Sequence, residues 1–432
     1  MRTNQSLAAA VLALVALAAP AMGQDVAIRN ATILTVTNGT IQNGTIVVRD
    51  GVITAVGADV AVPAGMQVID GTGMYVTPGL IDAHSHMAIE GGINEGSESV
   101  TPEVIINVSS DDQTIYRALA GGTTAANLLH GSANTIGGQA AVIKMRWGKP
   151  ADELYFEGAP RIVKFALGEN VTRMNSNQSD SDRRFPKSRM GVEQTLRWWF
   201  SQGREYEQEW QSYRAARDGV APRVDLRLQA LVDIMNGDIL VHAHSYRADE
   251  ILMLMRVAED FDFRINTFQH VLEGYKVADE LREHGAMAST FAEMWAYKVE
   301  AWDAIPHNMA IMSDRGVVVS VNSDSGERVR RLYQEAAMGV KYGGMDDNEA
   351  LKMVTLNPAL QLGIADQAGS IEVGKDADIA IFSAHPFAPQ ARVEKTLVDG
   401  IVYFDRSQAM TLQKLIDSKR AITTTTTEEG GA

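Results

Sequence analysis

The chain has 432 residues, of which 45% are hydrophobic, 22% charged and 6% aromatic. These fractions are ordinary for a folded globular protein, and they exclude wholesale disorder, collagen and coiled coil. The formal net charge is −15, so we do not expect nucleic acid as a partner, since nucleic acid is usually bound by a basic patch. Because the chain has no cysteine, a metal site would have to use histidine, carboxylate or modified lysine side chains.

Residues 1–23 have the features of a Sec signal peptide. Arg2 supplies a positive charge, residues 7–19 are uncharged and apolar, and Ala21 and Gly23 fit the small-x-small cleavage rule. The apolar run is shorter than the ~20 residues that a spanning helix needs. We therefore expect an exported bacterial protein, periplasmic or secreted, without stable membrane insertion. An uncleaved N-terminal helix is the alternative.

The two ends of the mature chain share a β-rich pattern. Residues 24–76 contain β-branched runs separated by Asn38-Gly39, Asn43-Gly44 and Asp50-Gly51, which are hairpin signals. Residues 366–410 repeat this pattern. We expect one small β-sandwich domain built from both termini, followed by a low-complexity C-terminal tail over 411–432.

Residues 77–365 alternate between strand-like and helix-like segments. Such alternation predicts an α/β fold, a (β/α)8 TIM barrel, with an open doubly wound sheet as the alternative. A long insertion, residues 171–235, begins polar and continues as a helical hairpin. The eight candidate strands are Thr77–Ala83, Thr123–Leu128, Ala141–Met145, Arg161–Phe165, Ile239–His242, Phe263–His270, Ala286–Phe291 and Val317–Val321.

Metal-binding side chains recur at the ends of these predicted strands. His84 and His86 lie two residues apart on one strand, so their side chains point the same way. Active sites of TIM barrels lie at the C-terminal ends of the strands, where the other candidate side chains also fall. The full set at these strand ends is His84, His86, Lys164, His242, His244, His270 and Asp324.

Several motifs resemble those of the amidohydrolase superfamily. They are the sequence Thr-Pro-Gly-Leu-Ile-Asp-Ala-His-Ser-His over 77–86, Asn322-Ser323-Asp324, the later Thr355-Leu-Asn-Pro-Ala, and Gly-Ser-Ile-Glu-Val-Gly-Lys-Asp-Ala-Asp-Ile over 369–379. The split β-domain fits as well, and the likeness covers nearly the whole mature chain. Within the superfamily, the chain resembles the imidazolonepropionase-related branch, which also contains prolidase-like zinc dipeptidases.

The resemblance implies a site with two divalent metal ions, most typically Zn²⁺, with Mn²⁺ or Co²⁺ as alternatives. His84, His86 and Asp324 would hold one ion, His242 and His270 the second, and a carboxylated Lys164 would bridge them. Asp324 would also act as the catalytic acid and base. Three alternatives stay open. Lys164 would be a structural lysine paired with Asp324 or Glu169, His244 would replace His242 as ligand, or His270 would contact substrate in a mononuclear site.

Four side chains at the predicted mouth are candidates for substrate contact. They are His244, Tyr246, Arg247 and His130. An arginine can bind a substrate carboxylate with two parallel hydrogen bonds, and Arg189 is a further candidate for that role. For Arg247, a salt bridge with Asp249 or Glu250 is the ordinary alternative.

The resemblance implies metal-dependent hydrolysis of a carbon–nitrogen amide or peptide bond by a metal-bound hydroxide. A dipeptide, an N-acyl amino acid or a cyclic amide would be the small-molecule substrate, and homo-oligomers are common in such families. The runner-up is a mononuclear deaminase or an imidazolonepropionase-like ring-opening hydrolase. A non-catalytic binding protein that keeps the barrel is the third possibility.

Overall fold

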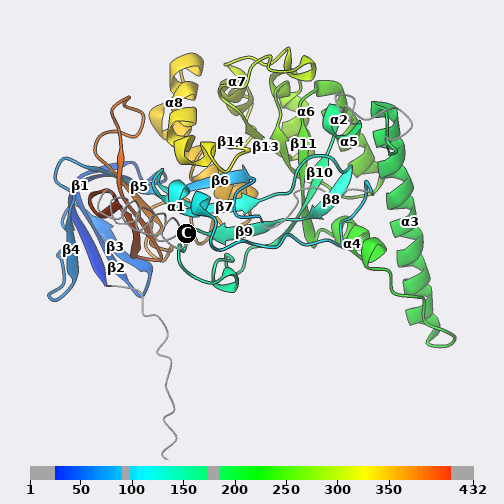
Figure 1. The fold of residues 1–432 in the computed structure, drawn as a ribbon, viewed down its shortest axis with the longest axis horizontal. Helices are drawn as coiled ribbons and strands as arrows, with labels where there is room; N and C mark the ends of the chain where they lie inside the picture. Colours follow the sequence, from blue (N-terminus) through cyan, green and yellow to red (C-terminus); the bar gives the residue numbers. More distant parts are fainter. Residues whose placement is uncertain (1–24, 90–97, 173–183, 410–432) are drawn as a thin grey trace, which may run out of the picture.

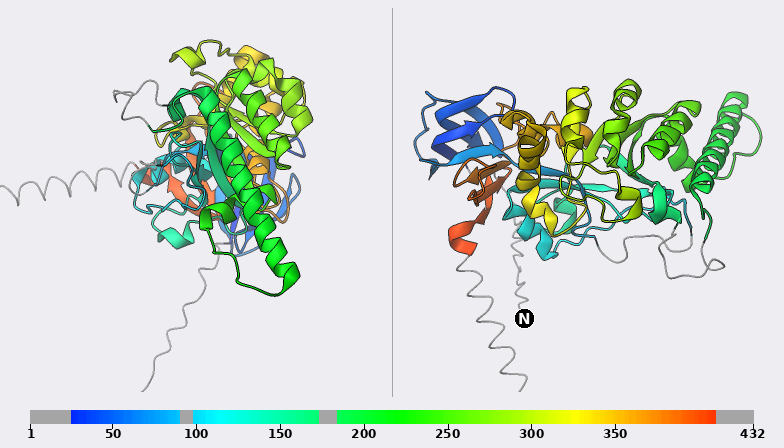
Figure 2. Two further views of the ribbon diagram at one scale, coloured as in Figure 1. Left: turned by 90° about the vertical axis from the view of Figure 1, so that its right-hand side faces the viewer. Right: turned by 90° about the horizontal axis from the view of Figure 1, so that it is seen from above.

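The computed structural model describes residues 25–89, 98–172 and 184–409. The predicted signal peptide and the C-terminal tail from residue 411 onward lie outside these residues. Figure 1 shows a sheet built from both chain ends on one side, and the strands and helices of the middle segment beside it. The long helix α3, Arg189–Ala216, lies at the opposite end of the molecule from that sheet (Figure 2).

Strands from the two ends of the chain pair in one eight-stranded sheet. Its order is β17-β16-β15-β5-β1-β2-β3, with β4 paired to β1. The joint between the two ends is the antiparallel pair β5 and β15, in which Pro78 faces Ile379. The strands are β1 Val26–Leu34, β2 Thr40–Arg49, β3 Val52–Gly57, β4 Gln67–Asp70, β5 Tyr75–Pro78, β15 Ile379–Phe382, β16 Val393–Val398 and β17 Ile401–Asp405.

The middle segment has a mixed α/β fold with two further sheets. Strands β10 to β14 pair in parallel, and β8 joins the edge of β10 in the antiparallel sense. In the other sheet, β6 pairs in parallel with β7. The strands are β6 Leu80–Ser85, β7 Thr123–Leu128, β8 Ile136–Gln139, β9 Ala141–Lys144, β10 Arg161–Ala166, β11 Ile239–Ser245, β12 Ile265–His270, β13 Met287–Thr290 and β14 Val319–Val321.

The third predicted strand differs from the regular alternation. Strand β9 forms where Ala141–Met145 was expected, but it runs antiparallel to β7. Parallel neighbours need a crossover, usually a helix, whereas the segment between β7 and β9 holds only β8. The described strands of the middle segment therefore form two separate sheets, one of six strands and one of three.

Helices connect and cover the parallel strands. Helix α5 follows β11, and its side chains Ile251, Leu254 and Val257 are buried in the main hydrophobic core. Across the described ranges, no helix combines the length and apolar character needed to cross a bilayer. The helices are α1 Gln113–Leu119, α2 Gly168–Thr172, α3, α4 Leu226–Met235, α5 Ala248–Asp260, α6 Ala278–His284, α7 Asn308–Asp314, α8 Leu332–Gly343, α9 Asp347–Lys352 and α10 Leu356–Gln361, with short 3-10 turns η1 Ala151–Glu153, η2 Gly274–Lys276, η3 Val299–Ala301 and η4 Arg328–Arg331.

A buried lysine ties the middle segment to the sheet from the chain ends. Lys144, the last residue of β9, is only 2% exposed, and its Nζ lies 2.6 Å from Asp376, 3.3 Å from Asp378 and 2.5 Å from Asp399. Burial opposes the charge of Lys144, but these three carboxylates raise its pKa. The three acids come from the C-terminal part of the chain, so one ammonium group joins segments more than 230 residues apart.

Lys144→Met should therefore destabilise the fold by about 3–5 kcal/mol, because it leaves three carboxylates together without their shared cation. The free energy of unfolding from urea titration measures this. The matched control is Lys149→Met. Lys149 lies at the surface and pairs with Glu153, four residues later in the chain, so its loss should leave the urea midpoint unchanged. Equal midpoints for the two variants would contradict the joining role of Lys144.

Candidate metal centre

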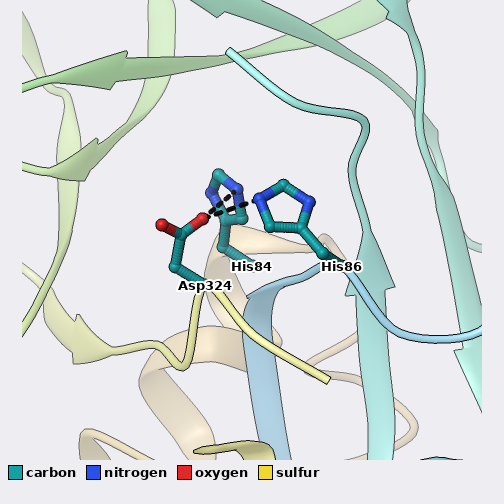
Figure 3. Close-up of side chains that lie close together, drawn as sticks. All are labelled: His84, His86 and Asp324. Atoms are coloured by element: carbon teal, nitrogen blue, oxygen red, sulfur yellow. Dashed lines mark ion pairs between the residues drawn. The ribbon is translucent and has the colours of Figure 1, made fainter. Parts of the chain in front are cut away.

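Two histidines and an aspartate from opposite parts of the chain converge on one point (Figure 3). His86 Nε2 lies 2.8 Å and His84 Nε2 3.2 Å from Asp324 Oδ1. One ligand atom from each of the three residues lies within 4.8 Å of the others, which is the spacing of a shared cation site. The other ring nitrogen of His86, Nδ1, lies 2.6 Å from the carbonyl of Leu129, a contact that orients Nε2 toward the site.

The end of β14 is hydrogen-bonded directly to the end of β6. The backbone N–H of Asp324 donates to the carbonyl of His84 at 2.9 Å, and Asp324 has a left-handed φ of 48°. Asp82, inside the first motif, accepts from the backbone N–H of His84 at 3.2 Å and of Ser323 at 3.1 Å. Burial raises the pKa of Asp82 to about 7. Sequence reasoning passed over Asp82, although it lies two residues before the first histidine.

Lys164 and His270 lie against the same group. Lys164 Nζ is 3.0 Å from His84 Nε2 and donates to the carbonyl of His130 at 2.6 Å. The His270 ring centre is 4.7 Å from that of His84, and His270 Nε2 lies 3.9 Å from Asp324 Oδ1. Burial lowers the pKa of Lys164 to about 7, against the attraction of Asp324. Five of the six predicted ligands are thus in one place.

The sixth predicted ligand, His242, lies elsewhere. Its ring nitrogens face the carbonyl of Gln361 at 3.2 Å and the side-chain amide of Gln269 at 2.9 Å. By contrast, the His244 ring centre is 4.7 Å from that of His270. Residues 242 and 244 share a strand face, but successive side chains on a face lie at different depths along the strand. The geometry therefore favours His244 over His242, which was the alternative left open by the sequence.

The donor set fits a bound cation. Within the described residues, His84 Nδ1 and both ring nitrogens of His270 are buried without a hydrogen-bond partner. Leaving such atoms unpaired costs ~1–3 kcal/mol each, unless another group binds them. Burial also lowers the pKa of His270 to about 3 and the pKa values of His84 and His244 well below the usual value. These imidazoles are therefore neutral at pH 7, the form that binds metal ions.

Comparison with known proteins identifies the family. Residues 75–403 match the model of the amidohydrolase family, which is more than half of the chain. The chain belongs to the amidohydrolase family. The crystal structure of an amidohydrolase from Thermotoga maritima is 30% identical to it and superposes with a TM-score of 0.80, covering 88% of this chain and all of that one.

Two curated relatives of this family member extend the comparison. It is 28% identical to the amidohydrolase tasK of Hapsidospora irregularis over 80% of this chain, but it spans only 38% of the length of that protein. It is 24% identical to the imidazolonepropionase of Brucella anthropi over 78% of this chain and 85% of that one. These matches confirm the predicted superfamily and its imidazolonepropionase-related branch, a class of metal-dependent hydrolases that act on carbon–nitrogen bonds. The crystal structure of a prolidase, 16% identical with a TM-score of 0.52, shares the fold.

The predicted substrate contacts of this amidohydrolase occupy different surroundings. The Tyr246 ring lies against His244 and His270, and its hydroxyl is 2.6 Å from that of Tyr297. His130 is buried beside Lys164, and its Nε2 has no hydrogen-bond partner among the described residues. Tyr246 and His130 are thus next to the group that we call the metal-binding group, which consists of His84, His86, Asp324, Lys164 and His270.

The two predicted arginine contacts are paired within the protein. Arg247 makes two 2.9 Å hydrogen bonds to Asp249 at the surface, the ordinary alternative for this residue. Arg189 contacts Glu250 and Glu300 rather than open space at the mouth. Three neighbours of His244 and Tyr246 were not anticipated, namely Ser132, Asn170 and Lys298. They lie in segments after three different strands, and no local motif marks them.

His244→Gln should reduce the number or affinity of bound metal ions, whereas His242→Gln should leave both unchanged in the folded protein. The reason is that His244, unlike His242, lies beside the unpaired nitrogens of His270. Zn²⁺ titration with a competing chelator measures the affinity, and elemental analysis gives the stoichiometry. Loss of metal in the His242 variant alone would restore the original assignment.

Proposed function

We propose that this protein is an exported, metal-dependent amidohydrolase that cleaves a carbon–nitrogen amide or peptide bond in a small molecule. The observation that carries the proposal is the group of His84, His86 and Asp324, with Lys164 and His270 against it and several buried lone pairs unpaired. The family assignment supports the reaction class. Export to the periplasm or beyond the cell rests on the signal-like sequence of residues 1–23.

The metal set of the proposal follows from the contacts. His84, His86 and Asp324 would hold one divalent ion, and His244 with His270 would hold a second. A carboxylated Lys164 would bridge the two positions, and Zn²⁺ suits such nitrogen and oxygen donors, with Mn²⁺ or Co²⁺ as alternatives. When bound, divalent ions of this kind lower the pKa of water and polarise a carbonyl oxygen.

Asp324 is the proton carrier in this proposal. Burial alone would raise the pKa of Asp324, but His270, His86 and Lys164 lower it below its usual value, so the group is a carboxylate at neutral pH. A carboxylate there can accept a proton from the attacking water and deliver it to the leaving nitrogen. Tyr246 would orient the substrate in this proposal. Its ring stacks on the ring of His270, and its hydroxyl is hydrogen-bonded to the hydroxyl of Tyr297.

Lys164 has the chemistry that carboxylation requires. Carbon dioxide adds only to a neutral amine, forming an N–C bond and releasing a proton to give an anionic carbamate. Burial shifts the pKa of Lys164 to about 7, so a large fraction of the amine is neutral near physiological pH. The carbamate would supply negative oxygen donors where the unmodified side chain offers none.

The substrates of the proposal are dipeptides, N-acyl amino acids and cyclic amides. The match to an imidazolonepropionase favours a second candidate, ring opening of a cyclic amide at a mononuclear site, and the compact three-residue group would hold that single ion. About two ions per chain supports the first candidate, and one ion supports the second. A closed (β/α)8 barrel and a composite β-sandwich domain complete the proposed architecture.

Wild-type protein loaded with Zn²⁺ or Mn²⁺ should release free amine from members of a library of dipeptides, N-acyl amino acids and cyclic amides. Asp324→Asn should lower kcat by ~10²–10⁴-fold, because it removes the proton carrier. Amine release and bound metal are measured on the same samples. Asp314→Asn, an exposed change of the same kind in α7, is the control and should keep full activity. Unchanged turnover in the Asp324 variant would remove this residue from its role.

Bicarbonate should strengthen metal binding more at pH 8 than at pH 6, because the neutral fraction of Lys164 rises as pH passes through about 7. Carbon-13 bicarbonate should give a carbamate signal in the NMR spectrum of the wild type. Lys164→Met should lose both effects, and Lys341→Met, at an exposed position, should keep them. A carbamate signal that persists in the Lys164 variant would place the modification elsewhere.

A further inference from the structure

Beside the metal-binding group lies a second charged cluster that the proposed reaction does not use. Arg189 Nε lies 3.1 Å from Glu250 Oε2, and Arg189 Nη2 lies 3.0 Å from Glu300 Oε2. The side chains of Glu250 and Glu300 are only 5% and 2% exposed. The three residues come from the starts of α3 and α5 and from the segment after β13. We call them the Arg189 clamp.

The two carboxylates of the Arg189 clamp hold the segment that follows β10. The backbone N–H of Gly168 donates to Glu250 Oε1 at 3.0 Å, and the next N–H, of Glu169, donates to Glu300 Oε2 at 2.9 Å. Gly168 has φ of 80°, and a Cβ there would lie 2.6 Å from Glu300 Oε2. The carboxylates therefore fit a backbone position that only glycine can occupy without a shift.

The held segment carries a side chain to the metal-binding group. Asn170 Nδ2 lies 3.5 Å from His244 Nε2, while Asn170 Oδ1 accepts from Lys298 Nζ at 3.3 Å. Lys298 Nζ is also 3.0 Å from Glu300 Oε1 and 4.1 Å above the centre of the Tyr246 ring. Contacts thus run without a break from Arg189, through Glu300 and Lys298, to Asn170 and the rings beside His270.

Arg189 is the group on which this arrangement depends. Two buried carboxylates close enough to share one guanidinium repel each other. Removing the guanidinium would leave Glu250 uncompensated, while Glu300 would keep only Lys298. The planar guanidinium of Arg189 contacts the two carboxylates through two different nitrogen atoms. The ammonium group of a lysine has only one nitrogen and does not offer this geometry. Arg189 is also the first residue of α3, so the long insertion supplies the cation that fixes two segments beside the metal-binding group.

We propose that Arg189, Glu250 and Glu300 are positioning residues that hold the 167–172 segment and thereby keep Asn170 against His244 and Lys298 over Tyr246. Arg189 thus acts through the backbone of Gly168 and Glu169, and it does not bind the substrate. The catalytic part of this inference rests on the proposed function, because turnover is the property that a misplaced His244 and Tyr246 would change.

The first experiment compares Arg189→Gln with the double variant Arg189→Gln/Glu250→Gln in the full-length, metal-loaded enzyme. The single variant should lower kcat at least ~10-fold, with metal content retained. The double variant should regain most of this loss, because one of the two buried charges is removed while the new amide oxygen at position 250 can still accept from Gly168. Arg197→Gln, on the same helix and paired with Glu193 and Asp260 at the surface, is the control and should keep the wild-type kcat.

A second readout does not depend on activity. Hydrogen exchange at the amides of Gly168 and Glu169 should be faster in Arg189→Gln than in the wild type and the Arg197 control. Arg189→Lys keeps the positive charge and replaces the glutamine variant if that variant does not fold. Hydrogen exchange at Gly168 and Glu169 should be faster in Arg189→Lys than in the wild type, but slower than in Arg189→Gln. Unchanged exchange in this segment, or a lowered Tm with wild-type kcat, would overturn the inference. If exchange responds as expected but the wild type hydrolyses no amide, the proposed function fails and the clamp stands.

Discussion

One carboxylate, that of Asp82, joins the two chain segments that make the metal-binding group. It accepts the backbone N–H groups of His84 and Ser323, and the Ser323 hydroxyl donates to its other oxygen at 2.5 Å. Asp324 and the two histidines are thereby fixed at adjacent strand ends, although Asp82 and Ser323 are 241 residues apart in the chain. The hydrogen bond from the Asp324 N–H to the His84 carbonyl joins the same two strand ends, so the positions of His84 and Asp324 rest on both contacts.

Burial then decides the chemistry of the joined segments. Charged forms are costly away from water, so the imidazoles of His84 and His270 are neutral and Lys164 is easily deprotonated. Asp324 is the exception, since its neighbours hold it in the charged form despite burial. Neutral nitrogen donors, a fixed carboxylate and unpaired lone pairs are groups that divalent cations bind. The same desolvation that keeps these side chains unprotonated therefore favours metal binding, because metal ligands must be deprotonated.

The sequence reveals the parts of this arrangement that depend on local pattern. The two histidines at the end of β6 were predictable from their spacing after an apolar strand, and Lys164, His270 and Asp324 from their places at later strand ends. The choice between His242 and His244 was not, because spacing fixes the face of a strand but not the depth at which each ring finds partners. The direction of β9 was not predictable either, because it depends on the segment between β7 and β9, which contains no helix. Asp82 and Arg189 were equally hidden, since their roles depend on partners such as Ser323 and Glu300, far away in the chain.

These long-range partners share one physical principle. At the mouth, side-chain carboxylates accept hydrogen bonds from backbone N–H groups of the loops. Asp82 accepts from His84 and Ser323. Glu250 accepts from Gly168, and Glu300 accepts from Glu169. A carboxylate can accept several such bonds at once, and each is stronger than a neutral one. The cost is a buried negative charge, which Arg189 offsets in one place, while Asp82 instead has a pKa raised to about 7. Loops held in this way keep the side chains that they carry at fixed positions around the metal-binding group.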